Sequence, residues 1–216
     1  MIPPREALHR LRQGNREFVD GQAAPTPGDG LLGRSLRPAD LVSQQQPFAI
    51  ILGCSDARVP AEIIFNQGIG DLFVIQVAGN IVAPSQIGSI EFAAAQFGTR
   101  LVVVLGHSHC GAILGTLKEL QRPSGQRSRN LGSIVNRVRP SVEVLLHTEL
   151  RHDLDALVHH AVRANVSASV NQLRHGSPIL EPLTESGDLV VVGAEYSLAT
   201  GCVEFFDNPL DEAGSS

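Results

Sequence analysis

Three side chains of the kind that bind soft or borderline metal ions follow two apolar stretches of the chain. Cys54 comes after residues 48–52, and His107 and Cys110 come after residues 101–105. Short apolar runs of this kind predict strands that are buried on both faces of a parallel sheet. The carboxyl ends of such strands meet at one edge, where open α/β sheets bind their ligands. Because thiolate and imidazole groups suit zinc, Cys54, His107 and Cys110 are predicted to form a zinc site.

Two other interpretations of these residues stay open at this point. The first is a buried cysteine with histidines that share no role. The second is a closed structural zinc site, in which His109 or Cys202 would supply a fourth ligand. Cys202 lies far from both motifs in the sequence and is expected to be a small core residue, whereas His109 is expected to lie beside the metal or in solvent.

A carboxylate and a guanidinium follow the first cysteine closely, because Asp56 and Arg58 lie two and four residues after Cys54. As a surface ion pair they would add little to stability. Beside zinc, however, Asp56 could accept a proton from a zinc-bound water or occupy the open position on the metal. Arg58 would keep Asp56 ionised and oriented through its planar fork of donors. The pair is therefore a candidate for catalysis beside the metal.

Strands that alternate with helices must position these side chains. We expect strands at residues 48–52, 72–77, 101–105 and 189–194, and a hairpin over residues 196–206. We expect helices over residues 3–21, 59–66, 85–97 and 111–120, a further one that starts near 130 and breaks or kinks at 140, and one over 153–173. The N-caps of three of these helices would be Ser85, Asn130 and Asp153. The fold class is α/β, with a mostly parallel four-stranded sheet flanked by helices, an antiparallel C-terminal hairpin strand and an N-terminal helical arm.

The chain is expected to form one domain overall. Residues 1–47 would make the N-terminal helical arm and a linker, and residues 48–216 the α/β zinc-binding catalytic domain. The apolar stripe of the arm is narrow, which suggests that the helix packs on something else, such as a partner subunit.

The composition limits the classes of partner. The chain has 216 residues and a net charge of −5. This overall negative charge does not favour binding to nucleic acid or to an anionic membrane. No apolar run is long enough to span a bilayer. The first residues are charged where a signal peptide needs an apolar core, and three cysteines do not make a disulfide framework. We therefore expect a cytoplasmic protein.

Four motifs together resemble the β-class carbonic anhydrases of bacterial type, and the similarity extends over nearly the whole chain. They are CSDARVPAE (54–62), GDLFVIQVAGN (70–80), GSIEFA (88–93) and GHSHCGA (106–112). The resemblance implies one Zn²⁺ per chain, held by Cys54, His107 and Cys110. It also implies that Asp56 and Arg58 are the catalytic dyad.

The resemblance implies further site residues and an oligomer. Gln45 matches a glutamine that hydrogen-bonds substrate across a subunit interface, and Phe73 matches an apolar wall of the carbon dioxide pocket. Phe92 falls where many relatives have tyrosine, so that wall lacks a hydroxyl group. The backbone N–H of Gly111 would bind the anion. The family forms homodimers whose N-terminal helix embraces the neighbour, and often homotetramers.

The expected function is the zinc-dependent, reversible hydration of carbon dioxide to bicarbonate and a proton by zinc-bound hydroxide. Two alternatives stay open at this stage. A carbonyl sulfide or carbon disulfide hydrolase could use the same site, and the width of the pocket would decide between the substrates. A non-enzymatic zinc-binding scaffold is the other alternative, although a purely structural site would not need Asp56 and Arg58.

Overall fold

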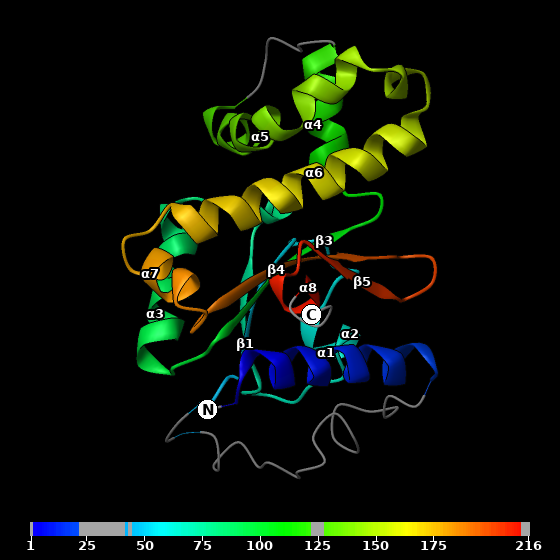
Figure 1. Cartoon of the computed structure of the whole chain (residues 1–216). Helices are drawn as coiled ribbons and strands as arrows, with labels where there is room; N and C mark the ends of the chain where they lie inside the picture. Colours follow the sequence, from blue (N-terminus) through cyan, green and yellow to red (C-terminus); the bar gives the residue numbers. More distant parts are fainter. Residues whose placement is uncertain (1, 22–41, 43–44, 122–127, 213–216) are drawn as a thin grey trace.

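A sheet of five strands forms the centre of the computed structural model (Figure 1), which describes residues 2–21, 42, 45–121 and 128–212. The strands are β1 (Ala49–Gly53), β2 (Leu72–Gln76), β3 (Leu101–His107), β4 (Val190–Tyr196) and β5 (Val203–Phe206). They lie in the order β2-β1-β3-β4-β5, with β1 to β4 parallel and β5 antiparallel to β4. This confirms the predicted fold class.

Helices cover both faces of the sheet (Figure 1). The α-helices of the described residues are α1 (Pro4–Val19), α2 (Ala61–Ile64), α3 (Pro84–Gln96), α4 (Gly111–Gln121), α5 (Arg129–Val142), α6 (Leu154–His175), α7 (Leu180–Glu185) and α8 (Pro209–Glu212). Short 3-10 helices are η2 (Ala78–Asn80), η3 (Glu143–His147) and η4 (Glu149–His152). Alternate residues of β1 face opposite layers, since Ile51 packs with the α1 side and Ile50 with the α3 and α6 side.

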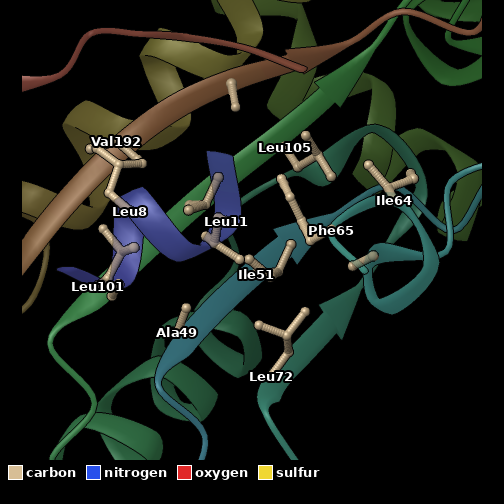
Figure 2. Packing of buried hydrophobic residues seen from close by; sticks show 14 of the residues in the cluster. Leu8, Leu11, Ala49, Ile51, Ile64, Phe65, Leu72, Leu101, Leu105 and Val192 are labelled. Carbon is tan, nitrogen blue, oxygen red and sulfur yellow. The ribbon is translucent and has the colours of Figure 1, made fainter. Parts of the chain in front are cut away.

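Helix α1 packs against the sheet of its own chain. Figure 2 shows Leu8 and Leu11 lying over β1, β3 and β4, where Ile51, Leu101 and Val192 belong to the same buried cluster. Leu8 and Leu11 of the expected narrow stripe are therefore covered by the sheet of their own chain, and the contact of this helix with a partner subunit stays a prediction. The proposed boundary between residues 1–47 and 48–216 stays a prediction, and most of the expected linker lies outside the described residues.

A buried asparagine fixes α1 to two other parts of the chain. The Asn15 side-chain amide donates to the carbonyls of Ile64 (3.1 Å) and Gly201 (2.9 Å), and its oxygen accepts from the backbone N–H of Val203 (2.8 Å). These bonds join α1 to the end of α2 and to the hairpin between β4 and β5. A buried amide must be satisfied in this way, so Asn15 specifies how α1 docks.

Helix α6 lies close to the opposite face of the sheet. As predicted, Asp153 caps it, because its carboxylate accepts from the Ala156 backbone N–H at 3.0 Å. A Cβ atom at Gly106 of β3 would come within 2.6 Å of Val166 and 3.1 Å of Val162, both on α6. Glycine at this position therefore allows the helix to approach the strand next to the predicted zinc ligands.

Several predicted boundaries and caps differ from the structure. Ser128, rather than Asn130, caps α5, and the helix continues through Pro140 to its end. Ser85 lies inside α3, which starts one residue earlier, after an uncapped Ala83. The strand expected at 189–194 and the first arm of the hairpin are one strand, β4. Local capping preferences compete with packing at helix ends, so these positions are the least determined by sequence. The sequence did not predict α7 and α8.

None of the helices that the structure describes is both long and apolar enough to cross a membrane.

We predict that α1 contributes to the stability of the folded chain. Replacement Leu11→Ala should lower the free energy of unfolding by about 2–5 kcal/mol, because this fully buried side chain leaves a cavity between α1 and the sheet. Leu131→Ala is the matched control, since Leu131 is 60% exposed and should change stability by no more than about 0.5 kcal/mol. Denaturant unfolding of both variants measures the difference, and equal losses would show that α1 is not part of the core.

Candidate metal centre

Two neighbouring strands bring the three predicted ligands together. Cys54 directly follows β1, His107 is the last residue of β3, and Cys110 precedes the first residue of α4. The strands are paired in parallel, with Gly53 opposite Leu105. The two sulfur atoms and a ring nitrogen of His107 lie within 4.8 Å of one another, and all three residues are buried.

The geometry of this group fits a zinc ion. The Sγ atoms of Cys54 and Cys110 are 4.0 Å apart, close to the ~3.8 Å expected for two sulfurs at ~2.3 Å from a tetrahedral metal. Nδ1 of His107 lies 3.0 Å from the carbonyl oxygen of Ser108 and is therefore the protonated nitrogen. Nε2 of His107 is buried and has no hydrogen-bond partner among the described residues, so its lone pair is available to a metal.

Hydrogen bonds distinguish the two thiol groups. The bond from Cys110 lowers the pKa of Cys54 to about 4, and the Gly79 backbone N–H lowers it further against the opposing effect of burial. The same sulfur–sulfur bond and burial raise the pKa of Cys110. A divalent ion binds both sulfurs as thiolates, so its binding releases any proton that the pair holds.

Asp56 and Arg58 form a bidentate pair at the open side of the group. Arg58 donates from Nε to Oδ1 of Asp56 (2.9 Å), from Nη2 to Oδ2 (2.7 Å), and from its backbone N–H to Oδ1 (3.0 Å). These bonds hold the pKa of Asp56 well below its usual range. Oδ2 of Asp56 lies 3.9 Å from Nε2 of His107, so the carboxylate faces the position that a metal would take. The pair thus lies directly beside the group of Cys54, His107 and Cys110.

Gly111 is exposed and is the first residue of α4, next to Cys110. Amide groups in the first turn of a helix have no partner within the helix. The N–H of Gly111 is therefore free of the helical ladder and close to the site, as its predicted role requires.

Three predicted site residues lie elsewhere in the chain. Gln45 is exposed and precedes the amino end of β1, whereas Cys54 follows its carboxyl end. Phe73 pairs with Ile50, three residues before the end of β1, about 10 Å back along the strand. Phe92 on α3 is 51% exposed, and its ring centroid lies 6.3 Å from that of Phe73. The structure therefore does not bring Gln45, Phe73 and Phe92 to the metal group of their own chain.

The two candidates for a fourth ligand lie outside the group. His109 is exposed and adopts a left-handed backbone conformation with φ of 54°. Cys202 is an exposed free cysteine in the hairpin between β4 and β5, so the expectation that it is a small core residue is wrong. A hairpin places its connecting residues in solvent, which an apolar residue type cannot indicate.

Sequence reasoning missed one contact to the metal group. The backbone N–H of Gly79 donates to Cys54 Sγ over 3.4 Å, from the turn η2 that follows β2. The motif AGN at 78–80 is a turn signal, but it does not show that the turn reaches Cys54.

The fold and the site define an α/β protein with two cysteines and a histidine arranged for zinc at the carboxyl edge of its sheet. The carbonic anhydrase family model matches residues 49–203. A carbonic anhydrase of Mycolicibacterium smegmatis is 37% identical over 204 residues, which cover 93% of this chain and 92% of the relative. Carbonic anhydrase 2 of Mycobacterium tuberculosis is 36% identical over 92% of this chain and 90% of its own length.

Solved structures agree with this match. The β-carbonic anhydrase CcaA has a TM-score of 0.70 and 26% identity, covering 94% of this chain and 88% of its own. A tetrameric β-carbonic anhydrase from Sordaria macrospora also reaches a TM-score of 0.70, and at 24% identity it supports the fold alone. The chain belongs to the carbonic anhydrase family, in its β class, and is thus a carbonate dehydratase, a lyase. Enzymes of this class use zinc, and the group of Cys54, His107 and Cys110 is arranged to hold it.

We predict that removing any one ligand strips the metal. Cys54→Ser, His107→Ala and Cys110→Ser should each reduce bound zinc from about one ion per chain to a small fraction, because a three-ligand site cannot lose one donor and keep its affinity. Cys202→Ser is the matched control and should keep all its zinc. Elemental analysis of purified protein gives the ratio, and full zinc in the Cys54→Ser protein would refute the site.

Proposed function

We propose that the chain hydrates carbon dioxide at a zinc site formed by Cys54, His107 and Cys110, with Asp56 and Arg58 as the catalytic dyad. The orientation of the Asp56 carboxylate is the observation that supports this proposal most strongly. Its Oδ2 faces the unpartnered Nε2 of His107 while Arg58 holds both of its oxygens. A purely structural metal site would have no use for an oriented carboxylate on its open side.

Zinc bound there would lower the pKa of a water molecule from about 16 toward about 7, and so supply hydroxide at neutral pH. The chain's own residues then control the proton and the substrate. Because Arg58 holds the pKa of Asp56 well below its usual range, this carboxylate stays ionised and accepts a hydrogen bond. Asp56 would therefore orient the proton that must leave and pass it to buffer or solvent without retaining it. The N–H of Gly111 would donate to the anion that forms.

We propose that Gln45, Phe73 and Phe92 complete the site of a partner subunit. Each lies away from the metal group of its own chain, toward the amino ends of β1 and β2 or on α3. In a two-fold dimer, residues remote within one chain can meet the site of the other. The exposure of Phe92 in the single chain supports this arrangement, because a partner would cover it. The assembly would be a homodimer that can pair into a homotetramer.

We also propose a cytoplasmic location. The support is chemical: the site needs both buried cysteines as thiolates, and a reducing compartment keeps them from oxidation.

The dyad can be tested against a matched ion pair. Asp56→Asn should keep its zinc and lose about 100- to 10,000-fold in hydration rate, because an amide accepts a proton poorly. Arg58→Ala should cause a similar loss by releasing Asp56. Asp71→Asn is the control, since Asp71 pairs with Arg10 at 2.8 Å outside the metal group and should leave the rate unchanged.

Stopped-flow measurement of carbon dioxide hydration on metal-quantified protein gives these rates. An Asp56→Asn protein that runs at the wild-type rate across neutral and alkaline pH would refute the dyad. A zinc-loaded wild type with no hydration activity would refute the proposed function as a whole and favour a scaffold.

The shared site can be tested by mixing two inactive variants. A Gln45→Ala chain keeps its own Asp56, and an Asp56→Asn chain keeps its own Gln45. If Gln45 serves the partner's site, random mixing of dimers should restore about a quarter of the sites. Activity that stays at the sum of the two separate variants after unfolding, mixing and refolding would place Gln45 in the site of its own chain.

A further inference from the structure

The turn η2 touches the metal centre without supplying a ligand to it. Its Gly79 N–H donates to Cys54 Sγ, with a nitrogen–sulfur distance of 3.4 Å. Gly79 (φ 73°) and Asn80 (φ 42°) both adopt left-handed backbone conformations. A Cβ at Gly79 would also lie only 3.1 Å from that of Ala112 on α4. The turn therefore needs external contacts to stay in this conformation next to Cys54.

Helix α6 supplies those contacts. Asn165 Nδ2 donates to the carbonyl of Gly79 at 2.8 Å, and Ser169 Oγ donates to the carbonyl of Asn80 at 3.2 Å. The two side chains are four residues apart, on one face of the helix, so they meet two consecutive carbonyls of the turn. Asn165 is 2% exposed and Ser169 is 5% exposed.

The bonds that these two buried polar side chains donate end outside α6. Their neighbours on the buried side of the helix are apolar and include Val162 and Val166. Burying an amide or a hydroxyl group is unfavourable unless it makes hydrogen bonds. Here the donated bonds end on the turn that carries the Gly79 N–H. The two side chains of α6 thus stabilise the conformation of η2.

We propose that Asn165 and Ser169 are positioning residues for the metal centre, which hold the turn η2 so that the Gly79 amide stays directed at Cys54 Sγ. This inference rests on the proposed function, because it takes Cys54 as a zinc ligand. A hydrogen bond to a metal-bound sulfur withdraws electron density from it and fixes its direction. Groups that orient and tune a ligand in this way affect metal affinity by about 10- to 100-fold.

A cavity beside Asn165 and Ser169 should allow either side chain to be shortened without unfolding the chain. Asn165 and Ser169 line a cavity of about 360 Å³ together with Ile81, Val82 and Gln172. Water can therefore reach the carbonyls of the turn when a side chain is shortened, which limits the loss of stability. Water does not fix the turn as a helix-anchored amide does, so the Gly79 N–H should lose its alignment with the sulfur.

The experiment compares zinc transfer to a chelator and the absorption spectrum of cobalt(II)-substituted protein in three variants. Asn165→Ala should release zinc about 10-fold faster than wild type. Its sulfur-to-cobalt charge-transfer band should move to lower energy, because the sulfur of Cys54 becomes more electron-rich. Ser169→Ala removes one bond from the same turn and should change both readouts in the same direction by a smaller amount.

Asn15→Ala is the matched control, since Asn15 is also a buried asparagine with three hydrogen bonds, but on the α1 side of the sheet. It should lower thermal stability and leave the cobalt band unchanged. An unchanged band and release rate in both α6 variants would overturn the inference, as would an equal shift in Asn15→Ala. A wild-type protein whose cobalt spectrum has no sulfur band would instead overturn the assignment of Cys54 as a ligand.

Discussion

Two sulfur atoms and one imidazole nitrogen lie within 4.8 Å of one another in a buried site, at the ends of two neighbouring strands. Two thiolates at this distance repel each other strongly in a low-dielectric environment. A divalent cation removes this repulsion, because it neutralises both thiolates and accepts the lone pair of His107 Nε2. The fold must hold the three donors close together against this repulsion, and because they meet only in the folded chain, folding and metal binding are coupled.

The parallel sheet holds the donors in position. Strands β1 and β3 are neighbours, and every one of their residues is buried, so neither can shift without disturbing helices on both sides. Cys54 and His107 sit at the ends of these strands, where side chains leave the core and face the loops. Around them, Arg58 fixes Asp56, Ser108 fixes the tautomer of His107, and Gly79 contacts the sulfur of Cys54. Asp56, His107 and Cys54 thus each have a partner that sets their direction.

The sequence was informative where chemistry depends on local spacing. Continuous apolar runs predicted β1 and β3, and the residues that follow them predicted the metal group and the Asp56–Arg58 pair. It was uninformative where contacts are long-range. Asn165 lies 86 residues from Gly79, and a single polar residue within a helix gives no sign of such a bond. The same limit explains why the docking of α1 on its own sheet and the exposure of Cys202 were not predicted.

Two cysteines and one histidine of this chain are arranged to hold zinc. X-ray absorption at the zinc edge of the purified protein identifies the ligand atoms themselves. We expect two sulfur scatterers at about 2.3 Å and nitrogen or oxygen scatterers at about 2.0–2.1 Å, in a four-coordinate shell. A shell of four sulfurs, or one with only nitrogen and oxygen atoms, would contradict the site described for Cys54, His107 and Cys110.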